Sequence, residues 1–159
     1  MALNGVTRSA MFDGLRRRLG FGLPANAGER GEQLAADWLR RERGYRILAR
    51  NWRDPRDRRH ELDLVCRDGE ALVFVEVKAR AAGALVPGYY AVDRSKKQVM
   101  RRAIDAYLGL LKLPPRTFRF DVVEVTLASD AGSPAVLHFE NVTLFPKHHR
   151  GSLGNESGR

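Results

Sequence analysis

The chain has very few of the residues that build disulfides, zinc sites and membrane spans. It contains one cysteine, Cys66, which cannot form an internal disulfide, and no cysteine or histidine pattern has the spacing of a zinc site. No apolar run is long enough to cross a membrane. These absences predict a protein of a reducing, cytoplasmic compartment and argue against a secreted disulfide scaffold. The alternating pattern around Cys66 indicates that its thiol packs in the core.

Lysine is also scarce, whereas arginine is abundant. The 28 Lys+Arg residues include 5 lysines, and against 19 Asp+Glu residues they leave a net charge of +9. Such an excess favours a polyanionic partner, because neutralising phosphates supplies affinity that does not depend on base sequence. We therefore expect a polyanionic partner such as DNA or RNA. A high arginine content is also typical of GC-rich coding sequences, so charge by itself is a modest indication.

The length and composition fit one domain. With 159 residues, of which 43% are apolar, the chain can bury a proper core. We predict a basic, flexible arm over residues 1–27, a single domain over 28–145 and a disordered Gly/Ser-rich tail over 146–159. The scattered apolar residues of the arm cover too little area to favour a membrane-surface helix.

Hydrophobic periodicity predicts the elements of this domain. Helical spacing covers residues 28–43 and 95–111, and strand patterns cover 45–51, the hairpin 61–80, 117–127 and 136–144, the last at a sheet edge. The order α-β-β-β-α-β-β predicts an α/β sandwich with a mixed sheet flanked by helices. In the strand 117–127, Arg119 and Asp121 share a face, which favours an ion pair.

The second predicted helix carries basic residues near its start. Lys96 lies on the inner side of the first turn, where it reaches either an acidic site or a phosphate, or only extends past the edge of the core. Lys97 and Arg101 are expected to point outward and, with Arg80, to contact nucleic acid. The inner stripe of this helix is predicted to contain Val99, Ala103, Tyr107 and Leu110.

The hairpin over residues 61–80 is the most informative segment. Alternation places Leu62, Leu64 and Cys66 on one side of its first strand and Glu61 and Asp63 on the other. We predict Asp68-Gly69 as the tip of the turn, since glycine accepts a positive φ and aspartate tolerates it. This register puts Asp63 opposite Phe74 and Glu61 opposite Glu76, so that Asp63 and Glu76 become diagonal neighbours on a face that Lys78 and Arg80 continue. A three-residue or bulged loop would change the register.

The polar face of this hairpin interrupts a largely apolar strand. Val73, Phe74, Val75 and Val77 are typical of a central strand covered on both sides. Carboxylates in such surroundings hold protons unless cations compensate them. Lys78 supplies one charge, and a hard ion such as Mg²⁺ would supply the rest. The alternative is a solvated strand face with ordinary surface charges, and the residues alone leave both open.

The same residues resemble a known family. The order Glu32, Asp63, Glu76-Val77-Lys78 resembles the acid, then acid-x-Lys signature of restriction-endonuclease-like nucleases, which include archaeal Holliday junction resolvases. Over residues 28–126 the chain is more closely similar to the YraN-like family of small bacterial proteins, which is assigned to that superfamily. The shared segments are Gly31-Glu32, Glu61-Leu62-Asp63-Leu64, Phe74-Val75-Glu76-Val77-Lys78-Ala79-Arg80 and Arg119-Phe120-Asp121-Val122. One departure is His60, where the family usually has glycine; it alters the start of the strand and no ligand.

The resemblance implies a restriction-endonuclease-like sheet and a metal-dependent endonuclease acting on DNA, including branched or otherwise structured DNA. Asp63, Glu76 and the Val77 carbonyl would then hold Mg²⁺ or Mn²⁺, with Glu32 acting through water, and Lys78 would orient the attacking water or stabilise charge on the phosphorane. Glu61 would support Asp63 from one pleat away.

Two functions of other classes stay open beside the nuclease. One is a nucleic-acid-binding or assembly protein that keeps the nuclease fold without turnover. The other is a structural protein whose basic face meets an acidic protein. Junction-cleaving nucleases work as two-fold dimers, and the apolar segment Leu85-Val86-Pro87 would serve as a homodimer interface or cover its own core.

Overall fold

The computed structural model describes residues 26–81, 94–127 and 133–144. The elements, in chain order, are α2 (Ala27–Glu42), β1 (Arg46–Arg53), β2 (Glu61–Asp68), β3 (Ala71–Ala81), α3 (Arg94–Gly109), β4 (Thr117–Leu127) and β5 (Ala135–Phe139). This order confirms the predicted sequence of elements. Residues 1–25 of the predicted arm, the tail 146–159 and the segment Leu85-Val86-Pro87 lie outside the described residues.

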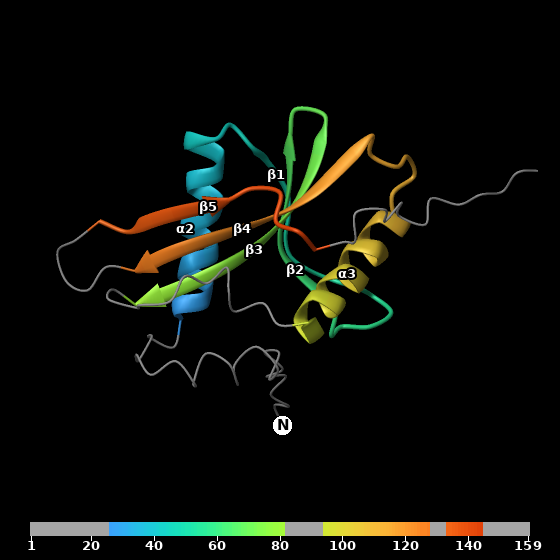
Figure 1. Ribbon diagram of the computed structural model, residues 1–159, viewed down its shortest axis with the longest axis horizontal. Coiled ribbons are helices and arrows are strands. Elements are labelled where there is room, and N and C mark those ends of the chain that lie inside the picture. The colour runs from blue at the N-terminus through green and yellow to red at the C-terminus, as the bar shows by residue number, and fades with distance from the viewer. Residues whose placement is uncertain (1–25, 82–93, 128–132, 145–159) are drawn as a thin grey trace, which may run out of the picture.

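The five strands form one mixed sheet in the order β1-β2-β3-β4-β5 (Figure 1). Neighbouring strands are antiparallel except β3 and β4, which run parallel over eleven Cα pairs from Ala71↔Thr117 to Ala81↔Leu127. A parallel pair needs a long crossover, and α3 supplies it. The sheet edges are β1 and β5, the latter as predicted.

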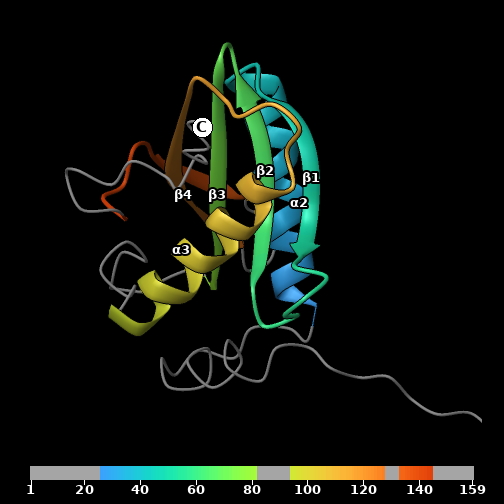
Figure 2. The same cartoon turned by 90° about the vertical axis from the view of Figure 1, so that its right-hand side faces the viewer.

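The two helices lie on opposite faces of the sheet (Figures 1 and 2). On the α2 face, Leu39 and Tyr45 pack with Val73, Val75 and Val77 of β3 and with residues of β2 and β4. On the α3 face, the buried residues include Ile104 of the helix and Leu72, Phe74, Phe120 and Val122 of the sheet. Strand β3 is therefore apolar on both faces, as its composition predicts for a central strand.

Each helix has 16 residues and buries one face. In α3 the buried positions are Met100, Ala103, Ile104 and Leu108, so the predicted inner stripe was rotated by about one position. Helix α3 ends at Gly109, and Leu110 beyond it is half exposed. Within the described ranges, no helix combines the length and apolar character that a bilayer crossing requires.

Helix α2 lies very close to β3 at Gly31. A Cβ added to Gly31 would lie 2.7 Å from the Cβ of Ala79, closer than real Cβ atoms come. Glycine is thus required here because the helix backbone rests almost directly on the strand. The next residue, Glu32, is held beside the sheet as a consequence.

The β2–β3 turn differs from the predicted one. Asp68 pairs with Ala71, so Gly69 and Glu70 form a two-residue loop, with Gly69 at φ 54°. Glycine with positive φ at the first loop position is the type II′ arrangement, whose twist matches that of the strands. The predicted Asp68-Gly69 tip was therefore wrong by one position, and the register differs by two residues: Val65, not Asp63, pairs with Phe74. A two-residue shift preserves which side chains share a face.

Candidate functional site

Asp63 lies one residue before the point at which β2 begins to pair with β3. The antiparallel ladder ends at Leu64↔Val75. One step beyond, the backbone N–H of Val77 donates a 2.8 Å hydrogen bond to Oδ2 of Asp63. A side-chain carboxylate thus takes the place of the backbone acceptor that a continued ladder would supply. The carboxylate of Asp63 is turned toward β3 by this bond.

The face of the sheet to which alternate side chains of β2 point also changes at Asp63. Leu64 and Cys66 share one side of β2, as predicted, and this side faces α2, but Leu62 packs with the α3-side cluster. Strict alternation would have put Leu62, Leu64 and Cys66 on one side of the strand, so the prediction was wrong for Leu62. The strand turns about its axis between Leu62 and Leu64 while its end stays paired with β1.

Glu76 and Lys78 complete the centre of the site. The carboxyl of Glu76 is buried, and Nζ of Lys78 contacts its Oε1. Burial, and then the charge of Glu76, raise the pKa of Asp63 well above its ordinary value, although Lys78 and the Val77 N–H act in the opposite direction. Asp63 therefore favours its protonated form, and with that carboxyl ionised the site would carry more negative charge than its own lysine neutralises.

Glu32 joins the site from the other layer. It is half buried on α2, next to the close contact at Gly31, and its charge adds to the raised pKa of Asp63. Glu61, in contrast, lies against Arg53 at 2.8 Å across the β1–β2 pair. The predicted position of Glu61 opposite Glu76 was wrong, because the register of the hairpin differs by two residues.

The predicted basic residues have different surroundings. Arg80 pairs with Glu124 of β4 at 2.6 Å, and Lys96 and Lys97 are half buried in the first turn of α3. Arg101 was expected to point outward, but its Nε donates a hydrogen bond to the carbonyl of Leu144. That orientation was wrong because the segment after β5 returns to cover α3.

The oxygen donors at this site suit a hard divalent cation. Among the described residues, no group of three or more histidine, cysteine or acidic side chains could hold a metal ion. The donors that the structure brings together at the end of the β2–β3 ladder are two carboxylates, from Asp63 and Glu76. Mg²⁺ typically keeps several waters and binds proteins through one or two carboxylates, so this set and its excess negative charge fit such an ion.

Sequence reasoning missed Glu124. It is buried at 5% exposure within an apolar stretch of β4, and its Cα partner on β3 is Lys78. The signal that could have found it is the one that singled out Glu76: a carboxylate in a strand whose neighbours are all apolar.

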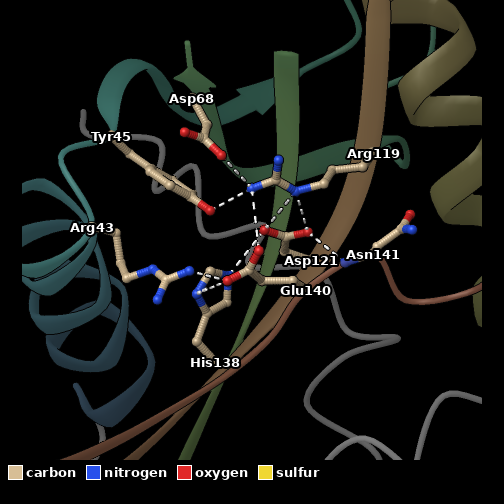
Figure 3. A network of polar contacts seen from close by, with 8 residues as sticks. All are labelled: Arg43, Tyr45, Asp68, Arg119, Asp121, His138, Glu140 and Asn141. Carbon is tan, nitrogen blue, oxygen red and sulfur yellow. Dashed lines mark hydrogen bonds and ion pairs between the residues drawn. The ribbon is translucent and has the colours of Figure 1, made fainter. Parts of the chain in front are cut away.

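A second polar network lies on the α2 face, around the start of β4 (Figure 3). The predicted ion pair is confirmed: Nε of Arg119 lies 3.1 Å from Oδ1 of Asp121. The fully buried Asp121 also accepts the backbone N–H of Asn141 and faces Nε2 of His138, both at 2.9 Å. Burial by itself raises the pKa of Asp121, but these hydrogen bonds outweigh it and hold the pKa below its ordinary value. Arg119 further contacts Asp68 of β2 and the hydroxyl of Tyr45, so this network links β4 to β2 and to the segment between α2 and β1.

Comparison with known proteins identifies the family. The model of the "Uncharacterised protein family UPF0102" matches residues 31–125. A UPF0102 protein of Anaeromyxobacter dehalogenans is 50% identical over 113 residues, which cover 70% of this chain and 79% of that relative. A UPF0102 protein of Beutenbergia cavernae is 44% identical over 115 residues, covering 72% and 93%. The matched residues include all of the site from Glu32 to Glu124. The chain belongs to the UPF0102 family.

Proposed function

We propose that this protein is a divalent-cation-dependent nuclease that hydrolyses phosphodiester bonds in DNA. The observation that carries the proposal is the meeting of Asp63 and Glu76 at the end of the β2–β3 ladder, where burial and mutual repulsion raise the pKa of Asp63. Two carboxylates placed together with one lysine are unfavourable unless a further positive charge joins them. The order Glu32, Asp63, Glu76-x-Lys78 and the order of elements support placement among restriction-endonuclease-like proteins.

Each residue of the site has a distinct role in this proposal. Asp63 and Glu76, with the Val77 carbonyl, would hold Mg²⁺ or Mn²⁺, and Glu32 would add negative charge from α2. The Val77 N–H fixes the orientation of the Asp63 carboxylate. When bound, the cation supplies a water of lowered pKa and neutralises charge on the phosphate.

Lys78 serves the phosphate rather than the metal. Its ammonium group contacts Glu76 in the protein alone. With a cation compensating Glu76, the same ammonium can orient the attacking water or stabilise charge that develops on the phosphorane. The net charge of +9 favours attraction of the nucleic acid, and Lys96 and Lys97 extend the positive potential along α3.

One observation favours a second candidate, a nucleic-acid-binding protein without turnover. The contact between Lys78 and Glu76, together with the raised pKa of Asp63, lets the site reach a low charge through its own lysine and a proton. A site compensated in this way needs no cation. The second candidate therefore predicts DNA binding with no response to Mg²⁺.

Metal titration followed by cleavage assays separates the two candidates. Wild type, Asp63→Asn and the exposed control Glu70→Gln would be titrated calorimetrically with Mg²⁺ and Mn²⁺ and incubated with branched, flapped and single-stranded DNA. The nuclease predicts metal-dependent cleavage by wild type and Glu70→Gln, and none by a folded Asp63→Asn. Cleavage that survives Asp63→Asn would overturn the assignment, and DNA binding without heat of metal binding or cleavage would support the second candidate.

A further inference from the structure

A second buried ion pair lies beside the proposed active site. Nε of Arg80 is 2.6 Å from Oε1 of Glu124, and the two side chains are 12% and 7% exposed. Lys78 and Arg80 stand two residues apart on β3 and so share one face of the sheet. Glu124, whose Cα pairs with Lys78, is on the neighbouring strand β4.

Stability alone does not account for this pair. Strands β3 and β4 are already joined by a parallel ladder from Ala71↔Thr117 to Ala81↔Leu127, so a further link adds little. Burying two charges is costly, and apolar replacements of similar volume are often as stable or more stable. Val122 and Phe74 on the same face show that apolar side chains fit this layer.

The chemistry of Arg80 leaves it able to bind a second acceptor. A guanidinium has five N–H donors, and a single carboxylate cannot satisfy all of them. Nε is the nitrogen paired with Glu124, yet its N–H is not aligned in a hydrogen bond. Charge attraction rather than an aligned hydrogen bond thus joins Nε to Glu124. The planar guanidinium, with donors beyond Nε, has the chemistry that suits the oxygens of a phosphate.

The backbone spacing of Lys78 and Arg80 is comparable with the spacing of phosphates on a nucleic-acid strand. Residues two apart on a strand are separated by about 6.6 Å, which is comparable with the distance between consecutive phosphates of one strand. We infer that Arg80 binds the phosphate adjacent to the one at Lys78, and that Glu124 is a positioning residue that keeps Arg80 in place. The ligand is a single strand with at least two consecutive phosphates. This inference rests on the proposed function in placing the reacting phosphate at Lys78.

The test measures binding of the full chain to a fluorescein-labelled single-stranded DNA by fluorescence anisotropy over a series of salt concentrations. EDTA is present throughout, so binding is read without metal-dependent cleavage. The main variant is Arg80→Gln/Glu124→Gln, which leaves the net charge unchanged and leaves neither charge buried alone. The matched control is Arg116→Gln/Glu70→Gln, an exposed pair at 3.8 Å at the opposite end of β3 and β4. Thermal unfolding checks that each variant is folded.

We expect the Arg80→Gln/Glu124→Gln variant to bind about tenfold more weakly and to lower the slope of log K against log salt by about 0.7, the value for one phosphate of a single strand. The Arg116→Gln/Glu70→Gln control should change neither quantity. Equal slopes and affinities for wild type and the Arg80→Gln/Glu124→Gln variant would overturn the inference.

The single variant Glu124→Gln tests the positioning role. It makes the chain more positive, so a general charge effect would strengthen DNA binding. If Glu124 positions Arg80, binding weakens instead, and Glu124→Asp restores part of it. Stronger binding by Glu124→Gln would overturn the positioning role.

The prediction of the Arg80 contact and the prediction of nuclease activity can be rejected independently of each other. Wild type that does not cleave DNA with Mg²⁺, combined with the expected loss of one phosphate contact, would reject the nuclease and keep the Arg80 contact. Cleavage that depends on Asp63, combined with an unchanged slope in the Arg80→Gln/Glu124→Gln variant, would reject the contact and keep the nuclease.

Discussion

Oδ2 of Asp63 accepts the backbone N–H of Val77 at 2.8 Å, at the place where β2 stops pairing with β3. This bond favours the ionised carboxyl, yet burial and the charge of Glu76 outweigh it and raise the pKa of Asp63. The carboxyl of Asp63 is thus fixed in orientation by one hydrogen bond and destabilised in its charged form.

Replacing Asp63 by asparagine should stabilise the metal-free protein at neutral pH. Because the folded-state pKa of Asp63 is raised, its contribution to stability falls as pH rises from the ordinary value of 3.8 through the folded pKa. Asparagine carries no charge and can still accept the Val77 N–H. We expect Asp63→Asn to raise Tm by a few degrees at pH 7.5 in EDTA and to have little effect at pH 4, as measured by differential scanning fluorimetry.

Addition of Mg²⁺ should make the Tm of wild type higher than that of Asp63→Asn. A ligand that binds the folded state raises Tm by mass action. Wild type should therefore gain stability with Mg²⁺, whereas Asp63→Asn should not. A lower Tm of Asp63→Asn in EDTA would contradict the proposed charge imbalance.

Gly31→Ala should destabilise the fold by about 1–3 kcal/mol, because overpacking a close contact forces the backbone to shift. The new Cβ would meet the Cβ of Ala79 at 2.7 Å, and α2 would have to move away from β3. The matched control is Gly109→Ala at the end of α3, where a Cβ meets nothing within 4 Å. Urea unfolding should show the control unchanged or slightly more stable. Equal stability of the two variants would show that the close approach does not constrain α2.

Asp121→Asn should remove stability at pH 7 and flatten the acid limb of the stability curve. The pKa of Asp121 is lowered in the folded state, so its contribution is present above about pH 4, near the ordinary value of 3.8, and is lost as pH falls through the folded pKa. Losing one partner of a buried charge network costs about 3–5 kcal/mol. Urea unfolding at pH 7 and pH 3 would measure both effects, with exposed Glu70→Gln as the control. A loss of the same size at both pH values would show that the carboxylate charge of Asp121 is not what stabilises the network.

Cys66 should be unreactive in the folded protein. Burial, and then the nearby charge of Asp121, raise the pKa of its thiol to about 12, so almost no thiolate is present at pH 8. Labelling with Ellman's reagent should be slow in buffer and rapid in concentrated guanidinium chloride. Fast labelling of the native protein at the full rate of a free thiol would contradict the buried position of Cys66.

Much of the fold could be read from the chain because its patterns are local. Helical spacing in 28–43 predicted α2 within a residue at each end, and the strand Thr117–Leu127 was predicted with its observed bounds. The apolar run around Phe74 predicted a central strand, and the structure buries it on both faces. The cytoplasmic location, the homodimer and the DNA partner stay predictions.

The predictions were wrong where the local structure depends on contacts between residues that are far apart in the chain. Either Asp68-Gly69 or Gly69-Glu70 can form a two-residue turn, and only the cross-strand contacts select the second. Leu62 breaks the alternation because β2 follows β1 after it has left β3, which no pattern along β2 predicts. Arg101 binds a carbonyl 43 positions away. Such contacts depend on the packing of layers rather than on neighbours in the chain.

The sequence by itself determined the elements, their order and the presence of unusual charges in apolar strands, because these follow from the chemistry of adjacent residues. Apart from the predicted pairing of Arg119 with Asp121 and the predicted approach of Asp63 to Glu76, the tertiary structure decided which charges meet. It brought Asp63 to Val77, Glu32 to Asp63 and Arg80 to Glu124. The physical reason is that turn geometry sets the register between strands and helix packing sets the distance between layers, and neither quantity is encoded at any single position.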